Sequence, residues 1–336
     1  MSDGANWSSI FEILTLESDY TNSTLVVSIF GDMTSQSFVN QTSVGQLTIN
    51  TQSRAHDFII HTGDIAYNLD TDCGHQGDTF MNDVEGITGN LIYMFGVGDH
   101  ELDHLGTYDN YKHRFAGERY VGVNNLDDWL SRHFYWSKAI PGIATFVYIN
   151  TGAYIDAAAF PTIKNQYDWL ESELASVNRT ETPWLVVLGH RSLYCTKDND
   201  TECTVEAHIL RNGWPGGLFA LEPLFHQYGV DVYQAGHTHH YQRTWPTYQS
   251  EPTQTDYSNP KATVYFTNGL GGPPSIDYIE VPNPSYMAFS DLTYTVAYTS
   301  YQFLSANQLV ISQLRASDNS VLDQITITQD NHASFV

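Results

Sequence analysis

The stretch HTGDIAYNLD, residues 61–70, follows a short apolar run, Phe58-Ile59-Ile60, that is typical of a β-strand. Asp64 comes directly after a glycine, where the strand ends and the carboxylate can leave the edge of a sheet. Tyr67 lies three residues further on, so its phenol oxygen can reach the same point. A carboxylate and a phenolate suit a hard, highly charged metal ion such as ferric iron. A single Gly-Asp is also an ordinary turn, so the interpretation depends on whether other strands end in the same way.

Four other predicted strands do end in this way, with an apolar run, a glycine and then aspartate or histidine. In chain order they are residues 25–30 followed by Asp32, residues 91–95 followed by Asp99 and His100, residues 184–188 followed by His190, and residues 231–234 followed by His237 and His239. Sites in open α/β sheets form outside the carboxyl ends of strands. We therefore expect these side chains to meet at one place, although they are spread over more than half of the chain.

The composition limits the kinds of partner that the protein can bind. Among 336 residues, 14 are basic and 38 are acidic, which gives a formal net charge of −24 at pH 7. Nucleic acids and anionic membranes are bound by basic patches, so neither is expected as a partner. No apolar stretch approaches the ~20 residues that span a bilayer. An enzyme with so acidic a surface needs metal ions to supply positive charge if its substrate is an anion.

Apolar spacing outside these five strands predicts a mixture of helices and further strands. The expected helices lie within residues 34–56, around residues 80–87 and over residues 167–177, and the expected strands at residues 143–150, 264–267, 293–299, 308–314 and 321–328. Residues 108–136 show no clear period. No repeat or low-complexity linker divides the chain, so we expect a lead-in over residues 1–24 and a single domain over residues 25–330.

Sequons and cysteine spacing favour a secreted protein. Asn-X-Ser/Thr sequons are acceptor sites for N-linked glycans, and they occur at Asn6, Asn22, Asn40, Asn178 and Asn199. Cys195 and Cys203 enclose the polar loop TKDNDTE and are expected to form a disulfide, which leaves Cys73 single. The alternative is a cytosolic protein with three reduced thiols.

The polar side chains after the five strands suit a pair of metal ions. They offer seven oxygen and imidazole ligands, which is more than one zinc ion needs and fits two metals ~3.5–4 Å apart. In such a pair a carboxylate bridges the ions, a bound water loses its proton, and the resulting hydroxide attacks phosphorus in line. The metals also neutralise charge on the phosphoryl oxygens. The predicted chemistry is hydrolysis of a phosphate ester.

Five motifs at these positions resemble the purple acid phosphatases of the calcineurin-like metallophosphoesterases. They are GDMT (31–34), GDIAY (63–67), GDHE (98–101), VLGH (187–190) and GHTH (236–239), and they occur in the family's order. The similarity runs from about residue 25 to 328, and segments such as GHRSLYC, GHTHHYQRTWP and TNGLGG look most like the animal and plant long forms. The resemblance implies a four-layer α/β/β/α sandwich of two mixed β-sheets. The long forms also carry an N-terminal β-sandwich that this sequence does not include.

The resemblance also implies a role for each side chain. Asp32, Tyr67 and His239 would bind a ferric ion, Asp99, His190 and His237 would bind a divalent zinc, manganese or iron ion, and Asp64 would bridge the two. The tyrosine–iron bond would give the family's purple colour. His100 would hydrogen-bond the phosphate or help to protonate the leaving oxygen.

Three neighbouring residues have more ordinary expected roles. Glu101 is expected to orient His100 or a backbone group. Arg191 could contact phosphate, but a salt bridge to a carboxylate is the favoured interpretation. His208 lies where some relatives supply a second active-site histidine, and for it too a structural role is favoured.

Two positions depart from the family's pattern. Asp99 stands where the family usually has asparagine, and its extra negative charge should weaken the divalent ion as a Lewis acid and repel phosphate. Thr34 stands where the family usually has glycine, and it is bulkier beside Asp32. Both departures put the rate of catalysis in doubt more than metal binding.

The sequence therefore predicts a secreted, binuclear acid phosphatase that acts on small phosphate monoesters. The alternative is a phosphatase-fold glycoprotein with weakened catalysis and a structural or surface-assembly role, which could include self-association. The complete ligand set favours the first hypothesis, whereas Asp99 and Thr34 favour the second. A phosphodiesterase or nucleotidase of the same superfamily is a third interpretation, and Tyr67 argues against it because those relatives lack the tyrosinate–iron bond.

Overall fold

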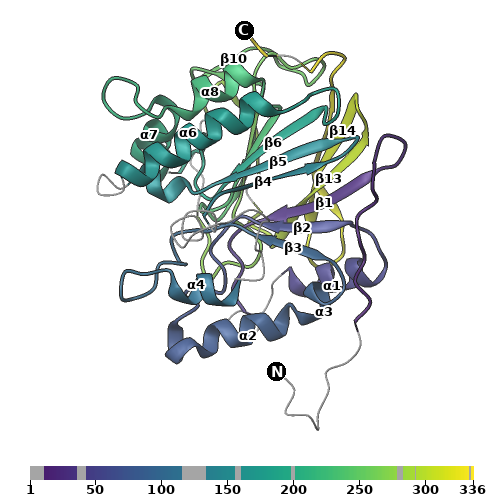
Figure 1. Ribbon diagram of the computed structural model, residues 1–336, viewed down its shortest axis with the longest axis vertical. Helices are drawn as coiled ribbons and strands as arrows, with labels where there is room; N and C mark the ends of the chain where they lie inside the picture. The colour runs from purple at the N-terminus through teal and green to yellow at the C-terminus, as the bar shows by residue number, and fades with distance from the viewer. Residues whose placement is uncertain are drawn as a thin grey trace.

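The computed structural model describes residues 11–35, 43–115, 134–155, 160–197, 201–277, 283–291, 293–332 and 334–336. Residues 11–24, the described part of the expected lead-in, contain no helix or strand. The chain that follows forms two mixed β-sheets with helices on both outer sides, as Figure 1 shows. The four-layer α/β/β/α sandwich is therefore confirmed, while the division into a lead-in and one domain stays a prediction.

The first sheet has six strands and carries three of the five polar strand ends. Its order is β15 (Val321–Thr328), β14 (Gln308–Arg315), β13 (Ala297–Ser305), β1 (Leu25–Phe30), β2 (Phe58–His61) and β3 (Ile92–Phe95). Strands β1, β2 and β3 are parallel, and Phe30, His61 and Phe95 lie side by side in the register. Because the three strands end at the same level, the loops that follow them leave the sheet at one edge.

The second sheet has seven strands and carries the two histidine motifs. Its order is β12 (Met287–Asp291), β8 (Tyr241–Thr244), β11 (Val264–Asn268), β7 (Val232–Ala235), β6 (Trp184–Gly189), β5 (Ala144–Ile149) and β4 (Trp136–Ile140). A separate short pair joins β9 (Thr247–Tyr248) to β10 (Glu251–Pro252). Because β6 and β7 are parallel neighbours, His190 and His237 leave this sheet close together.

Helices connect the parallel strands and cover the outer faces. They are α1 (Val44–Gln52), η1 (Thr71–Gly74), α2 (His75–Asp83), α3 (Glu85–Thr88), α4 (Asp109–Arg114), η2 (Thr151–Tyr154), α6 (Phe160–Ser176), η4 (Glu202–Glu206), α7 (Ala207–Asn212) and α8 (Leu221–Tyr228). In Figure 1, α6, α7 and α8 lie on one side of the sheets and α1 to α4 on the other. Among the described residues, no helix is both long and apolar enough to cross a bilayer.

The apolar core fills the space between the two sheets. Phe146 of β5 meets Phe58 of β2 and Phe303 of β13 edge to face, with ring centroids 5.4 and 5.7 Å apart. A second cluster packs the other face of β5, β6 and β7 against α6 and α8. All side chains of β5 and β6 are buried, because this sheet is covered on both faces.

The structure corrects the predicted elements in the second half of the chain. The strand expected at residues 293–299 begins only at Ala297 and continues to Ser305. The sequence does not predict β4, β8 or β12, which lie at or next to the edges of the second sheet. Strands β4 and β12 are partly exposed, and β8 buries polar side chains such as Gln242 and Arg243, so none of the three has a strong apolar pattern.

A buried ion pair links the two sheets. Asp323 on β15 accepts hydrogen bonds from Nε and Nη2 of Arg243 on β8 at 2.8 and 3.0 Å, and from the Tyr241 hydroxyl at 3.0 Å. The two charged side chains are 7% and 10% exposed. We expect Asp323→Ala to lower the free energy of unfolding by about 3 kcal/mol, because it leaves the buried guanidinium unpaired. Urea denaturation measures this change.

Asp318→Ala is the control for this prediction. Its carboxylate is 53% exposed, lies 3.7 Å from Arg315 and accepts the backbone N–H of Ser320 at 2.9 Å, so its removal should lower the free energy of unfolding by no more than ~1 kcal/mol. Equal losses in the two variants would contradict a special role for the buried pair.

Candidate metal centre

The loops after β1, β2, β3, β6 and β7 converge where the carboxyl ends of the two sheets meet. Two glycines permit this approach. A Cβ atom on Gly31 would lie 3.1 Å from Cα of Gly236, and a Cβ atom on Gly236 would lie 2.3 Å from a carboxylate oxygen of Asp32. The glycine in the repeated strand–glycine pattern thus marks the contact between the sheets, and the polar residue after it lies at that contact.

Four of the predicted metal ligands have an unusual backbone conformation. Asp32, Asp64, Tyr67 and His237 have φ values of 64°, 56°, 51° and 67°. Residues other than glycine seldom adopt this left-handed conformation, which costs of order 1 kcal/mol at each position. Such strain is typical of functional sites, where the surrounding fold dictates the direction of a side chain.

Asp64, Asp99, His190 and His237 form a cluster that could hold a metal ion. One ligand atom from each lies within 4.8 Å of the others. Nε2 of His190 is 3.1 Å from Asp64 and 3.0 Å from Asp99. Nδ1 of His237 is 3.0 Å from the same Asp99 oxygen. Two carboxylates and two imidazoles are a donor set suited to a divalent ion such as zinc or manganese.

Asp32, Tyr67 and His239 form a second group. The Tyr67 hydroxyl donates to Asp32 at 3.1 Å and lies 2.6 Å from Nε2 of His239. Burial, and then the charges of Asp32 and Asp64, hold the pKa of Tyr67 well above its usual range. A phenolate at this position therefore requires a nearby cation. The influence of Asp64 on this pKa also shows that Asp64 lies within electrostatic reach of both groups.

The histidine pKa values show that the cluster attracts positive charge. Burial opposes protonation of His237, but hydrogen bonds with Asp99 and Glu202 raise its pKa to about 9. Burial also opposes protonation of His190, yet the Asp64 carboxylate holds its pKa well above the usual range. The protonated rings supply positive charge that the carboxylates require. Metal ions would supply this charge instead, with release of the protons.

In His190 and His239 the ring nitrogen Nδ1 contacts an outer partner, which orients the ring so that Nε2 can bind a metal ion. Nδ1 of His190 lies 3.0 Å from the carbonyl oxygen of Thr62, to which it donates, so Nε2 can bind a cation. Nδ1 of His239 lies 3.2 Å from the Ser275 hydroxyl, and its Nε2 faces Tyr67. Both the donor set and these outer contacts fit a pair of metal ions.

Glu101 holds the loops after β2 and β3 together. Its buried carboxylate accepts backbone hydrogen bonds from Asp64 at 2.9 Å, Ile65 at 2.7 Å and Gly98 at 2.6 Å. Burial, and then the charge of Asp64, raise the pKa of Glu101 to about 8, and the backbone donors oppose this shift. Glu101 therefore orients backbone groups, which is one of the two roles expected from the sequence.

His100 lies beside both groups with one nitrogen facing them. Nδ1 is 2.9 Å from Oδ1 of Asn68, and the ring packs on Tyr67 with centroids 4.7 Å apart. Nε2 is 3.9 Å from Asp64, and the side chain is 37% exposed. Asn68 thus positions the ring, and the sequence offers no sign of this role except its place directly after Tyr67.

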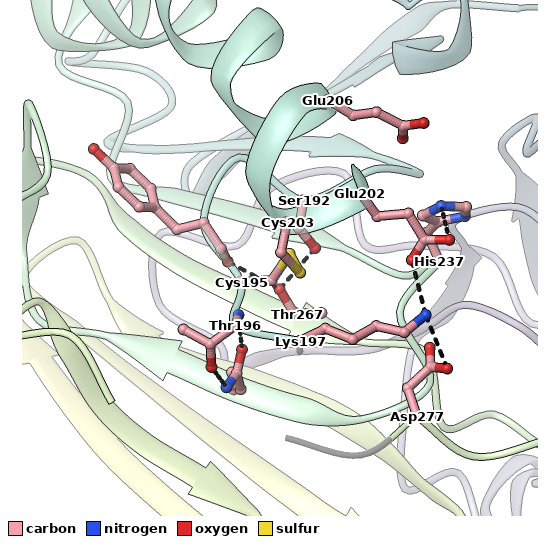
Figure 2. Close-up of a disulfide and its surroundings, with 12 residues drawn as sticks. Ser192, Cys195, Thr196, Lys197, Glu202, Cys203, Glu206, His237, Thr267 and Asp277 are labelled. Atoms are coloured by element: carbon pink, nitrogen blue, oxygen red, sulfur yellow. Dashed lines mark hydrogen bonds and ion pairs between the residues drawn. A yellow bond between two sulfur atoms is a disulfide. The ribbon is translucent and has the colours of Figure 1, made fainter. Parts of the chain in front are cut away.

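A network of charged side chains, which the sequence motifs do not predict, connects the two histidines after β7. Figure 2 shows Glu202 and Lys197 between His237 and Asp277. Glu202 lies 3.5 Å from Nε2 of His237 and 3.2 Å from Lys197. Lys197 lies 3.0 Å from Asp277. Asp277 accepts the backbone N–H of His239 at 2.8 Å.

The disulfide loop carries Lys197 and Glu202, two members of this network of charged side chains. The expected bond between Cys195 and Cys203 is present, and it closes the loop that carries Lys197 and Glu202 (Figure 2). Cys73 is free, as expected, and it is exposed. Burial disfavours the ionised form of Glu202, but its hydrogen bond with His237 lowers the pKa to about 2. In the sequence, Lys197 and Glu202 are marked only as charged residues of the loop TKDNDTE, with no sign of the partners that they contact.

Arg191 forms the salt bridges that the sequence favours. Nη2 lies 3.4 Å from Asp99, and Nη1 hydrogen-bonds Glu206 and lies 2.7 Å from Nε2 of His237. The guanidinium therefore offsets part of the extra negative charge that Asp99 brings. With Nδ1 of His237 on a metal, Nε2 would carry a hydrogen, so it could donate to Glu202 but could not accept from Arg191.

The other residues named from the sequence lie outside this cluster or outside the described residues. His208 is exposed on α7 and pairs with Asn212. The buried hydroxyl of Thr34 donates to the Ala66 carbonyl oxygen at 3.4 Å. Of the sequon asparagines, Asn22 and Asn178 are exposed. Those at Asn6, Asn40 and Asn199 lie outside the described residues.

The chain belongs to the calcineurin-like phosphoesterase family, whose model matches residues 27–241. Relatives confirm the resemblance to purple acid phosphatases. Acid phosphatase type 7 of Mus musculus is 30% identical over 317 residues, which cover 90% of this chain and 67% of the mouse protein. Probable inactive purple acid phosphatase 1 of Arabidopsis thaliana is 27% identical, over 98% of this chain and 54% of the plant protein.

A solved structure has the same fold. Purple acid phosphatase PPD1 from yellow lupin (Lupinus luteus) seeds superposes with a TM-score of 0.73 at 24% sequence identity. The match covers 93% of this chain and 55% of the lupin chain. The fold is therefore that of the metallophosphoesterases.

Glu202 should strengthen binding of a divalent ion through His237. We expect Glu202→Gln to lower the affinity for zinc about tenfold or more, because an outer carboxylate fixes the ring and makes it a stronger ligand. Competition with a chromogenic zinc chelator measures this affinity.

The control for Glu202→Gln is Glu173→Gln. Glu173 accepts a hydrogen bond from Ser137 and does not belong to the network of charged side chains at His237, so its replacement should leave the zinc affinity unchanged. If the zinc affinity of Glu202→Gln were also unchanged, Glu202 would have no role in metal binding.

Proposed function

We propose that the protein is a secreted acid phosphatase that hydrolyses small phosphate monoesters at a binuclear metal centre. The observation that carries this proposal is the convergence of Asp64, Asp99, His190 and His237 at one point, with their ligand atoms within 4.8 Å of one another. Family membership and relatives that are named acid phosphatases support it. The exposed asparagines of two sequons support secretion and N-linked glycans.

Each residue has a proposed role at the centre. Asp32, Tyr67 and His239 would hold a ferric ion, Asp99, His190 and His237 would hold a divalent zinc, manganese or iron ion, and Asp64 would be shared between the two. When bound, the metal pair supplies an activated water and neutralises charge on the phosphoryl oxygens. His100 directs Nε2 at the site and donates a proton or a hydrogen bond to the ester oxygen.

A second candidate function rests on Asp99. Its carboxylate adds negative charge where phosphate must approach, and one relative carries the name of a probable inactive phosphatase. Under this hypothesis the protein is a phosphatase-fold glycoprotein with a structural role, and self-association belongs to it. Arg191, 3.4 Å from Asp99, weakens this hypothesis because it offsets the added charge.

Hydrolysis of p-nitrophenyl phosphate at pH 5 separates the two functions. We expect the metal-loaded protein to release p-nitrophenol and to lose this activity after treatment with a chelator. Asp99→Asn should raise kcat/KM by less than tenfold, because it removes one negative charge that Arg191 already offsets. Activity that appears only in the variant would support the second function.

Iron bound to Tyr67 has a spectroscopic signature. A tyrosinate–iron(III) bond absorbs green light, so the iron-loaded protein should be purple. Tyr67→Phe should lose this absorption band. Elemental analysis of the same sample measures its iron content and so shows whether the ion is still bound. A band that persists in Tyr67→Phe would exclude this tyrosine as the ligand.

A further inference from the structure

A cavity of about 720 Å³ borders the metal cluster on one side. Gly98, Asp99 and Arg191 form part of its lining, so it begins at the cluster itself. Among the four residues of the cluster, Asp99 is the one whose side chain is substantially exposed, at 38%. A molecule that fills this cavity therefore reaches the cluster at Asp99.

The rest of the lining combines apolar side chains with uncharged polar ones, Asn150 and Thr162. Leu102, Tyr108, Phe134 and Ile155 contribute side chains from three separate segments of the chain. The rings of Tyr108 and Phe134 pack edge to face with centroids 4.8 Å apart. Leu102 is 46% exposed, so it offers apolar surface that a bound group could cover. Pockets of this volume and lining bind small molecules with a flat or branched apolar part.

The charges at this cavity disfavour an anionic occupant. Among the described residues that line it, the charged side chains are Asp99 and Arg191. The guanidinium of Arg191 is already paired with Glu206 and lies near Asp99. A second phosphate, as in a nucleoside triphosphate, would meet a carboxylate and apolar groups there without an unpaired cation. An uncharged group does not carry this desolvation cost.

We propose that this cavity binds the alcohol part of the substrate, and that this part is apolar and uncharged, as in an aryl or arylalkyl phosphate monoester. The proposal rests on the proposed phosphatase function, since the phosphate itself lies at the metal cluster. Phe134 and Tyr108 then act as specificity-determining residues. They contact the leaving group and not the phosphorus.

Two esters of primary alcohols test this proposal with the full, metal-loaded chain. Benzyl phosphate and glycerol 1-phosphate release alkoxides of similar reactivity, so a difference between them reports on binding of the alcohol part. We expect kcat/KM to favour benzyl phosphate about tenfold or more, mainly through KM, since one buried ring contributes an effect of this size. Phe134→Ala should remove most of this preference, and Phe134→Tyr should retain it.

Phe335→Ala is the matched control. Its ring packs on His226 of α8 and does not line this cavity, so the variant should keep the wild-type preference. Equal preference in Phe134→Ala and wild type would overturn the proposal.

Binding of two phosphonates separates failure of this proposal from failure of the phosphatase function. Calorimetry with benzylphosphonate and methylphosphonate requires no turnover. Tighter binding of benzylphosphonate that disappears in Phe134→Ala supports the cavity proposal even if neither ester is hydrolysed, and the phosphatase function alone then fails. Equal affinities in the wild type overturn the cavity proposal even if both esters are hydrolysed.

Discussion

The buried carboxyl group of Glu101 joins two parallel strand ends and so constrains the part of the site that carries Asp64 and Asp99. Its three backbone donors come from the loop after β2 and from the loop after β3. These bonds hold the loop of Asp64, whose backbone lies in the left-handed region. The glycines here are equally constrained, because a Cβ atom on Gly63, with φ of +107°, would lie 2.6 Å from the Gly98 nitrogen. A single carboxylate thus stabilises a backbone that would otherwise relax and separate the ligands.

Charge is the second constraint on the site, and it explains why the fold needs cations. The chain has a net charge of −24, and Asp64 and Asp99 are both within 3.1 Å of the same imidazole nitrogen of His190. Carboxylates this close repel each other unless positive charge lies between them. The raised pKa values of His190 and His237 show that imidazole protons can meet this need. Bound metal ions would meet it with greater charge, and they would also make an anionic substrate compatible with an acidic protein.

The part of this site that could be predicted from the sequence is the part that depends on strands. Buried parallel strands have continuous apolar runs, and the glycine and polar residue after each run have a fixed relation to the strand end. Asp32, Asp64 and His190 were therefore recognisable, and the register of β1, β2 and β3 brings the loops after them to one edge. Asn68 and Glu202 were not recognisable, since each acts through a hydrogen bond to a residue distant in the chain. Strands β4, β8 and β12 were missed for a different reason, because their side chains are partly exposed or polar and show no apolar period.

The surroundings of the cluster differ between its two sides, and this difference bears on how substrates are selected. On the side of the second sheet, the disulfide loop places Glu202 and Lys197 against His237 and Asp277, so that space is already occupied by paired charges. On the side of Asp99, the lining changes to Leu102, Tyr108 and Phe134 around an open cavity. Charged groups that pair with one another position the ligands but leave little affinity for further ions, whereas apolar surface gains free energy when an apolar group covers it. Under the cavity proposal, the same fold keeps its metal ligands while Leu102 and Tyr108 after β3, and Phe134 before β4, select which esters reach them.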